Sequence, residues 1–472
     1  MRTCLTILPA YIANVKTTVP EIPGVLPLPW GSSCLVALSG GPDSILLLHA
    51  LRAQSKKQNL VVFAAHVNYR LRGKDSDLDE SFCRSLCKKL GVRLFVKRLK
   101  PGALKSANLQ EHARRIRYDF FTELCDKHQI DLIATGHNRD DNVETVLMNL
   151  GRGAGTFGMG GMRERDSNII RPLLNLTRSE IESHLKQHKI AYRTDRSNLE
   201  PKYTRNKVRL QLLPQMAKLF GTAVAGNIHR SAKIISEQET ALRSIAGELL
   251  ANDARTTAGG KIVLDLDKFH LYYPMLQRIV IALCFEKLHG SLKDFDYRAS
   301  ERVLDAAAGK TDLVDLKAGI FAERCGQRLY IYRKTAPVGL IAIRRTGKTK
   351  VGEFWAEFTV KRLSRPDVSD TDLRSGKNLC VYFDAAKFAG KLAVRSVRSG
   401  DKMQPLGMKG TRKLSDILID AKIDRPLRDE IPILLCGSKI AWIVGLGVSD
   451  EFKVSGSTRS VIRLEVKPYR GI

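Results

Sequence analysis

A glycine-rich hexapeptide follows the first apolar run of the chain. Its residues are Ser39, Gly40, Gly41, Pro42, Asp43 and Ser44. Glycines let the backbone turn tightly and approach a phosphate with no side chain between them, and free amides at the start of the following helix form an anion site. Pro42 is tolerated in a first helical turn. The Ser39 and Ser44 hydroxyls can donate hydrogen bonds, and Asp43 can hold Mg²⁺ against phosphate oxygens. We therefore predict a phosphate-binding loop, which lacks the Gly-Lys-Ser/Thr of the common P-loop.

A second group of acidic residues begins a later helix candidate. Negative charge at Asp140 and Asp141 is favourable at a helix start. At about 100° per residue, Asp141 and Glu144 share one face of this helix. The apolar stripe, which we predict to be buried, lies roughly opposite and consists of Val143, Val146, Leu147 and Leu150. Helix capping with a solvated face is the simpler interpretation. We favour a metal or amine site instead, because these acids would lie at the same edge of the sheet as the phosphate loop.

Two further side-chain types suit a nucleotide site. His66 ends an apolar run, where a nucleotide contact and a structural role are equally supported. The stretch 109–128 carries Arg114, Arg115 and Arg117. A solvated basic face would account for one or two of them, whereas an arginine aimed into a cleft would neutralise phosphate charge with its planar fork.

Alternating apolar and amphipathic stretches indicate the fold that positions these residues. Strands are predicted at 34–38, 60–67, 93–99 and 131–135, and helices at 45–51, 77–90 and 109–128. This alternation predicts an α/β fold with a Rossmann-like parallel sheet covered on both faces. Parallel sheets bind ligands at the carboxyl ends of their strands, and the loops after residues 38, 67 and 135 all end there.

The length of 472 residues predicts about three domains. We expect an N-terminal extension over 1–30, an ATP-binding catalytic domain over 31–220, a helical domain over 221–335 and a small, β-rich α+β domain over 336–472. No stretch predicts a membrane span, because the longest apolar run, 431–448, reads as two strands and a turn.

Charge and cysteine content limit the partners and the compartment. The chain has 78 Lys and Arg against 49 Asp and Glu, a net charge of +29. So large a positive field favours a nucleic-acid partner over basicity kept for solubility alone. The nine cysteines include no C-x-x-C and are odd in number, which predicts reduced thiols and a cytoplasmic location.

Eight motifs together carry a family resemblance. Besides SGGPDS, they are HVNYRLR at 66–72, NLQEHAR at 108–114, DDNVETVLMNLGRGAG at 140–155, YRTDRSN at 192–198, YTRNKVR at 203–209, GDKMQPLG at 400–407 and KLSD at 413–416. SGGPDS resembles the signature of the PP-loop ATP pyrophosphatase superfamily. The whole set resembles bacterial tRNA(Ile)-lysidine synthetases, dense over 33–215 and 393–455. The family usually has His-Gly where this chain has Tyr69 and Arg70.

The resemblance implies a reaction in two steps. The 2-carbonyl oxygen of the wobble cytidine of tRNA(Ile) attacks ATP and releases pyrophosphate, and free lysine then displaces AMP to give lysidine. The carbon-nitrogen ligase so implied would use Asp43 and Ser44 for ATP and Mg²⁺. Arg114, Asp141 and Glu144 resemble the family's essential polar residues, and either acid would receive the lysine ammonium and its proton. Arg205 resembles a further cleft arginine.

Other interpretations stay open. Another PP-loop tRNA modifier, such as a 2-thiolation enzyme, would adenylate the same oxygen, although its relatives in cytidine thiolation usually carry C-x-x-C pairs. A non-catalytic tRNA-binding protein with a degenerate nucleotide fold is the alternative from another class. The basic segments 409–413 and 425–428 are candidate tRNA phosphate contacts. The oligomeric state is open, with a homodimer among the alternatives.

Overall fold

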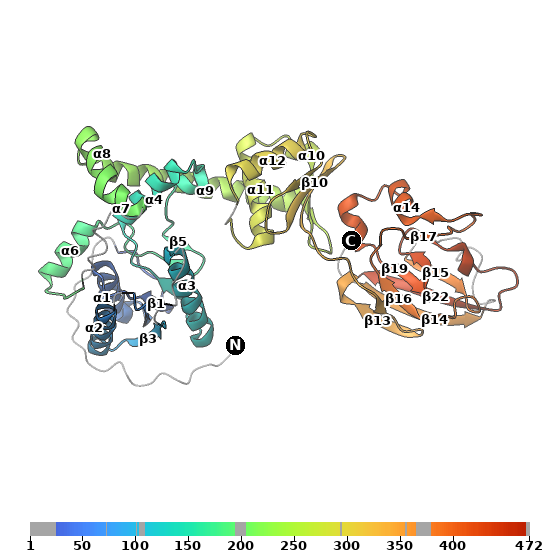
Figure 1. Ribbon diagram of the computed structural model, residues 1–472, viewed down its shortest axis with the longest axis horizontal. Coiled ribbons are helices and arrows are strands. Elements are labelled where there is room, and N and C mark those ends of the chain that lie inside the picture. The colour runs from blue at the N-terminus through green and yellow to red at the C-terminus, as the bar shows by residue number, and fades with distance from the viewer. Residues whose placement is uncertain are drawn as a thin grey trace. The chain divides into compact units, whose positions relative to one another are not determined.

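The chain folds into two compact units, Met1–Thr240 and Ala241–Ile472, in the computed structural model (Figure 1). The residues described are 25–71, 73–100, 102, 109–193, 204–292, 295–354, 356–364 and 379–468. Residues 1–24 of the predicted extension lie outside them, as do Arg72, Asn108, residues 194–198 and Tyr203 of the family motifs. The four-part division at 30, 220 and 335 stays a prediction.

The first unit is built on a six-stranded sheet of order β3-β2-β1-β4-β6-β5. Its strands are β1 (Ser33–Ala37), β2 (Val61–Asn68), β3 (Arg93–Arg98), β4 (Leu132–Ala134), β5 (Arg165–Asp166) and β6 (Ile169–Ile170). All neighbouring strands pair in parallel except β5, which runs antiparallel to β6. The predicted parallel sheet is confirmed.

Helices cover both faces of this sheet. The helices from α1 to α9 are α1 (Pro42–Lys57), α2 (Lys74–Leu90), α3 (Leu109–His128), α4 (Arg139–Gly151), α5 (Thr156–Met159), α6 (Arg178–Gln187), α7 (Thr204–Lys207), α8 (Leu213–Phe220) and α9 (Val224–Asp253), with a π-helical turn, η2 (Val208–Leu212), between α7 and α8. Val36 of β1 packs into a core shared with α1, α2 and α6, and its neighbour Leu35 packs into a second core with Phe121 of α3. Adjacent β1 residues thus point to opposite faces, and both faces are buried.

The second unit begins with a five-stranded antiparallel sheet of order β7-β8-β11-β10-β9. Its elements are β7 (Ala254–Thr256), β8 (Ile262–Asp265), α10 (Leu266–Phe269), α11 (Pro274–His289), α12 (Tyr297–Ala307), β9 (Leu313–Asp315), β10 (Ile320–Cys325) and β11 (Arg328–Arg333). The predicted helices in 221–335 are present, but the helical pattern missed this sheet. Two of its strands have three residues, too few to show a period of two.

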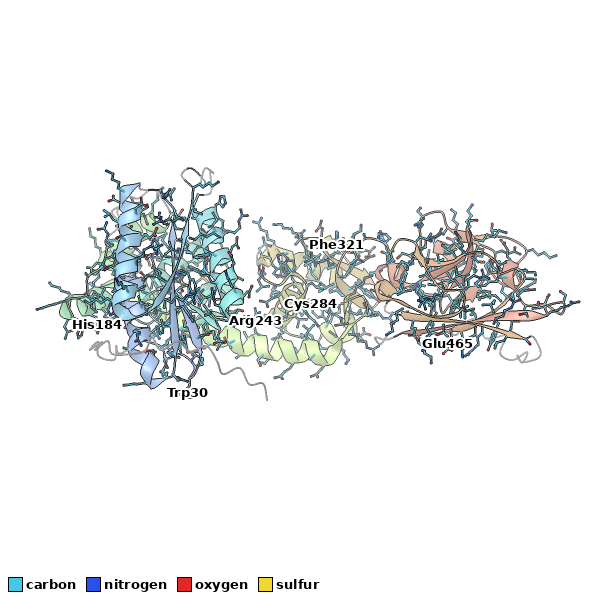
Figure 2. The ribbon with its side chains drawn as sticks, turned by 90° about the horizontal axis from the view of Figure 1, so that it is seen from below. Trp30, His184, Arg243, Cys284, Phe321 and Glu465 are labelled. Atoms are coloured by element: carbon cyan, nitrogen blue, oxygen red, sulfur yellow. The ribbon has the colours of Figure 1, made fainter. Side chains whose placement is uncertain are left out.

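The rest of the second unit is rich in strands, as predicted. Its elements are β12 (Ile341–Ala342), β13 (Gly347–Val351), η3 (Gly352–Phe354), β14 (Ala356–Ser364), β15 (Cys380–Asp384), β16 (Leu392–Arg395), β17 (Lys402–Met403), β18 (Arg412–Lys413), α14 (Leu414–Asp420), η5 (Arg425–Glu430), β19 (Ile433–Cys436), β20 (Lys439–Ile443), β21 (Gly447–Val448), η6 (Asp450–Phe452) and β22 (Ser460–Pro468). The predicted pair of strands and turn in 431–448 is the β19–β20 hairpin. Side chains fill the interior of each unit (Figure 2).

Two chain-wide features bear on the earlier expectations. Among the described residues, no helix combines the length and the apolar character that a membrane crossing requires. The eight cysteines in the described ranges are all unpaired, and six of them are buried. Burial raises the pKa of the Cys83 thiol to about 12, so this cysteine is an uncharged core residue.

Candidate active site

The glycine-rich hexapeptide joins β1 to α1, as predicted. Gly40 has φ +93°, a left-handed conformation that favours glycine. Gly41 caps α1 and Pro42 begins it. The Ser44 hydroxyl accepts from the amides of Ser39 and Gly40, both at 3.2 Å, and donates to the Gly41 carbonyl at 3.0 Å. Ser44 therefore braces the loop from within, a role that the hexapeptide alone did not indicate.

A cavity of about 200 Å³ opens beside this loop. Its lining consists of Ala37, Leu38, Ser39, Asp43, Ser44, Ala65, Val67, Tyr69, Arg117, Tyr118, Phe121, Thr135, Gly136 and His137. One part is aromatic, which suits a nucleobase, and another carries the phosphate loop. Burial lowers the pKa of His137 to about 4, so its ring is neutral at pH 7. The cavity thus combines a stacking surface with an anion-binding loop.

His66 and Arg114 are among the sequence-predicted residues that do not line this cavity. The His66 ring is buried and its Nδ1 lies 2.9 Å from the Leu38 carbonyl, so it ties β2 to the end of β1. Arg114 is exposed, with its guanidinium carbon 5.0 Å from the centre of the Tyr118 ring. Arg117, one turn along α3, lines the cavity instead. The nucleotide contact of His66 and the catalytic role of Arg114 stay predictions.

Asn138 connects the phosphate loop to α4. Its side-chain amide donates to Asp43 Oδ1 at 2.9 Å. Its side-chain oxygen accepts from the Asp141 amide at 2.9 Å, and Asp141 Oδ2 accepts from the Asn138 amide at 3.2 Å, which completes a capping box. Arg178 Nη2 lies 3.8 Å from Asp43 Oδ2. Burial raises the pKa of Asp43, while Asn138 and Arg178 act in the opposite direction.

Gly136 brings the loop after β4 against the phosphate loop. A Cβ placed at Gly136 would lie 3.1 Å from both the Asp43 carbonyl carbon and the Ser44 amide nitrogen. Such contacts are tighter than most real Cβ contacts, and the opposing atoms are backbone. Glycine is therefore what allows the two loops at the carboxyl edge of the sheet to meet.

Asp141 and Glu144 are held by two arginines from the next elements. Arg209 Nε lies 2.5 Å from Glu144 Oε1, and Arg209 Nη2 lies 3.2 Å from Asp141 Oδ1. Arg205 Nε lies 3.3 Å from Glu144 Oε2, and its Nη2 donates to Thr145 Oγ1 at 2.7 Å. Burial raises the pKa of Glu144, which is 1% exposed, while Arg209 opposes that shift.

The helix-face prediction for α4 was partly wrong. Val143 and Val146 are buried, but Leu150 is 57% exposed and Glu144 is buried. The face that carries Asp141 and Glu144 is covered by Arg205 of α7 and Arg209 of η2, which lie about 65 residues further along the chain. The residue periodicity of α4 alone could not show that side chains from distant segments bury this face.

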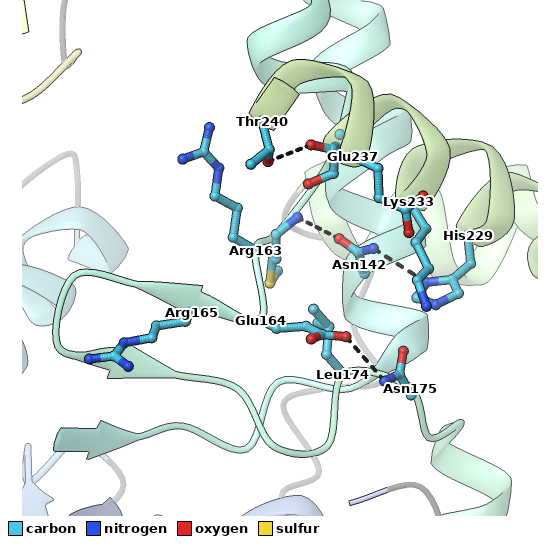
Figure 3. Close-up of a pocket in the computed structure, with 13 residues that line it drawn as sticks. Asn142, Arg163, Glu164, Arg165, Leu174, Asn175, His229, Lys233, Glu237 and Thr240 are labelled. Carbon is cyan, nitrogen blue, oxygen red and sulfur yellow. Dashed lines mark hydrogen bonds between the residues drawn. The ribbon is translucent and has the colours of Figure 1, made fainter. Parts of the chain in front are cut away.

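The opposite side of α4 is fixed at a second cavity of about 300 Å³ (Figure 3). There Asn142 Oδ1 accepts from the Met162 amide at 2.6 Å, and Asn142 Nδ2 lies 3.3 Å from His229 Nδ1. Lys233 and Glu237 of α9 also line this cavity. It contains none of the predicted site residues, so its bearing on the site is to hold α4 in place.

Among the described residues, no group of three or more His, Cys, Asp or Glu side chains is arranged to hold a metal ion. Mg²⁺ commonly takes one or two carboxylates together with substrate phosphates and water. Asp43, at the phosphate loop and 22% exposed at its side chain, fits that smaller requirement. Its Mg²⁺ role stays a prediction.

Three site residues, Asn138, Arg178 and Arg209, were missed as functional candidates. The Asn138–Asp141 spacing is a helix-start signature and could have identified Asn138. Arg117 was one of the three arginines considered for the cleft, although Arg114 was the one given a catalytic role. Arg178 and Arg209 lie in distant segments whose approach to Asp43 and Glu144 depends on the tertiary fold.

Comparison with known proteins gives consistent matches over most of the chain. Residues 25–216 match the model of the PP-loop domain, and residues 392–465 match that of the TilS substrate C-terminal domain. The tRNA(Ile)-lysidine synthase of Clostridium tetani is 32% identical over 93% of this chain and 95% of its own length. The corresponding proteins of Caldanaerobacter subterraneus and Symbiobacterium thermophilum are 33% and 32% identical, over 91% and 93% of this chain and 93% and 94% of theirs.

An ATP-binding type of loop, a cavity beside it and a carboxylate pair with one buried member thus lie at one edge of a parallel sheet, in a chain whose relatives match over 91% or more of its length. The chain belongs to the tRNA(Ile)-lysidine synthase family of ATP-dependent ligases.

Proposed function

We propose that this enzyme joins lysine to the 2-position of the wobble cytidine of tRNA(Ile), through an adenylated tRNA intermediate. The observation that carries the proposal is the bonded path Asp43–Asn138–Asp141, continued through Arg209 to Glu144. It connects a phosphate-binding loop to a carboxylate pair suited to an amine.

In the first step the cytidine 2-carbonyl oxygen attacks the α-phosphorus of ATP, and pyrophosphate leaves. The first-turn amides of α1, at Asp43 and Ser44, have no partner within the helix, and together with the positive end of α1 they would bind phosphate oxygens. Tyr118 and Phe121 offer surfaces for the adenine ring. Mg²⁺ on Asp43 would neutralise phosphate charge when bound. Arg178 lies beside Asp43, and its positive charge would stabilise the negative charge that develops on the leaving pyrophosphate.

In the second step the ε-amine of lysine attacks carbon 2 of the adenylated base, and AMP leaves with the former carbonyl oxygen. The amine loses protons as the C–N bond forms, and Asp141 or Glu144 receives one of them. Burial raises the pKa of Glu144, which makes this carboxylate a better proton acceptor than an ordinary surface Glu. AMP leaves far more readily than an oxide ion would, which is why one ATP is consumed.

The tRNA itself would bind through the positive charge of the chain and its terminal domain. The net charge of +29 supplies the field for backbone phosphates. In the predicted terminal contacts, Arg412 pairs with Asp420 at 2.6 Å, and Arg428 donates to the Ile423 carbonyl at 3.1 Å. Lys409 and Lys413 are exposed and remain the better candidates for phosphate contact. A homodimer stays a prediction.

The experiment is mass spectrometry of an isoleucine tRNA transcript treated with enzyme, ATP and lysine. We expect a mass gain of one lysine less one water, with one AMP released per tRNA. Asp43→Ala and Glu144→Ala should each abolish the product, while Asp166→Ala, an exposed acid of the same unit, should retain it. Full turnover by both site variants would refute the assignment, and sulfur incorporation would establish the thiolation alternative.

A further inference from the structure

The carboxylate pair already has its charge balanced. Asp141 and Glu144 supply two negative charges, and Arg205 and Arg209 supply two positive charges within 3.3 Å of them. Glu144 is 1% exposed, so water screens this group weakly. A lysine ammonium bound to the same carboxylates would add an unbalanced positive charge beside two guanidinium groups. Binding therefore requires that one arginine withdraw.

One acceptor of this pair is already available. Glu144 Oε2 is buried and makes no hydrogen bond among the described residues, because Arg205 Nε at 3.3 Å lies near it without hydrogen-bond geometry. An ammonium group has three donors and can use such an oxygen. The remaining acceptors that face an incoming amine, Glu144 Oε1 and Asp141 Oδ1, are both taken by Arg209.

Arg205 and Arg209 differ in how they are anchored. Arg205 also bonds Thr145 Oγ1 at 2.7 Å, and that hydroxyl donates to the Asp141 carbonyl at 2.8 Å, so Arg205 is tied to the α4 backbone. The hydrogen bonds of the Arg209 guanidinium go to the two carboxylates. Arg209 also lies in the π-helical turn η2, a local geometry that often occurs at functional sites. Of the two arginines, Arg209 is the one placed to move.

We propose that Arg209 is an internal cation that holds Asp141 and Glu144 ready for an amine and gives way when the lysine ammonium arrives. This inference rests on the proposed function. Arg209 is joined to the phosphate loop through Asp141 and Asn138, which bonds Asp43, so a displaced guanidinium has the phosphate side of the site beside it. Arg209 is then a positioning residue that couples arrival of the amine to neutralisation of the phosphates.

The exchange has a measurable consequence for affinity. While Arg209 occupies the carboxylates, only the fraction of enzyme with Arg209 displaced can bind lysine, and the apparent affinity is reduced by that fraction. If Arg209 only supported the carboxylates, its removal would have the opposite effect on lysine affinity, because the site would be disorganised and lysine would bind more weakly. The sign of the change in lysine affinity therefore distinguishes the two roles.

The test is lysine transfer from purified adenylated tRNA in single turnover, with the lysine concentration varied. For Arg209→Gln we expect the half-saturating lysine concentration to fall about tenfold, the equivalent of about 1.4 kcal/mol, while the rate of adenylation without lysine stays unchanged, because Arg209 then remains on the carboxylates. Arg152→Gln removes an exposed arginine at the end of α4 and should leave the half-saturating concentration unchanged. An unchanged or raised value in Arg209→Gln would overturn the inference.

Arg209→Lys keeps the test decisive if the glutamine variant does not fold. A lysine side chain engages one carboxylate as a point charge and cannot bridge two, so we expect half-saturation between the wild-type and glutamine values. A value at or above that of the wild type would overturn the inference. If Asp43→Ala and Glu144→Ala retained turnover, the proposed function would fail first, whatever the Arg209 variants showed.

Discussion

Asn138 Nδ2 lies 2.9 Å from Asp43 Oδ1, so the residue that caps α4 is bonded to the acid of the phosphate loop. The two residues are 95 positions apart in the chain. One asparagine thereby fixes the start of the carboxylate helix and the orientation of the candidate Mg²⁺ ligand. This bond therefore fixes how far the phosphate loop lies from the carboxylates of α4, Asp141 and Glu144.

The Asn138 bond predicts a separation of stability from catalysis. Asn138→Asp keeps an N-cap acceptor for the Asp141 amide but places a carboxylate against Asp43 where an amide donor stood. We expect the helix cap to be kept, because Asp and Asn are comparable caps, so that thermal stability falls only through repulsion between the two carboxylates, and tRNA adenylation per folded molecule to fall at least about tenfold, a loss of 1.4 kcal/mol. Pyrophosphate release measures the second quantity, and differential scanning calorimetry measures the first.

A matched cap elsewhere controls for helix stability. Asp296 caps α12 in the second unit by accepting from the Ala299 amide at 2.8 Å. Asp296→Ala should lower stability by about 1 kcal/mol and leave the adenylation rate per folded molecule unchanged. Equal adenylation by Asn138→Asp and wild type would show that the Asp43 contact has no catalytic consequence.

Gly136 predicts a steric effect on nucleotide binding. In Gly136→Ala the new methyl group meets phosphate-loop backbone at 3.1 Å, and the loop must shift by a few tenths of an ångström. We expect the KM for ATP to rise about tenfold, the equivalent of 1.4 kcal/mol, with the fold retained. Gly151→Ala at the end of α4 adds its methyl to open space and serves as the control. ATP saturation curves of the two variants would contradict this account if they coincided.

The sequence predicted local features of this fold better than long-range ones. The hexapeptide, the strand-and-helix alternation and the helix 109–128 were recognisable because spacing within a few residues determines them. The Arg209–Glu144 and Arg178–Asp43 contacts were not, because nothing local to α4 or the loop indicates which later arginine approaches. Leu150 matched the apolar period of α4 yet is 57% exposed, and a helical period alone does not show which residues of a last turn have tertiary neighbours.

His49 predicts how the stability of the first unit depends on pH. Its ring, on α1, is buried, and neither nitrogen has a hydrogen-bond partner in the described part of the chain. Burial lowers the pKa of His49, and the nearby Lys89 and His184 lower it further. An unfolded His takes up its proton near pH 6.5 while the folded one resists it. The stabilising contribution is therefore complete above about pH 6.5 and is lost as the pH falls below that value.

Urea unfolding at pH 7.5 and pH 5.5 would check this direction. The wild type should lose more unfolding free energy over this interval than His49→Leu, which cannot be protonated. His112→Leu on α3, a half-buried position, controls for the loss of one histidine and should follow the wild type. If His49→Leu and wild type lost the same free energy, another group would account for the acid sensitivity.

The positive charge of the chain predicts a steep salt dependence of tRNA binding. Each phosphate neutralised by Lys or Arg releases counterions, so the logarithm of affinity falls linearly with the logarithm of salt concentration. With about six to ten such contacts, affinity should fall at least about 10³-fold between 50 and 200 mM salt.

Lys409→Gln and Lys413→Gln, which change exposed lysines, should each reduce the slope of this salt dependence by about one. Lys439→Gln removes a lysine already paired with Glu451 and should leave the slope unchanged. A titration without salt dependence would mean that the net charge of +29 serves something other than binding the tRNA backbone.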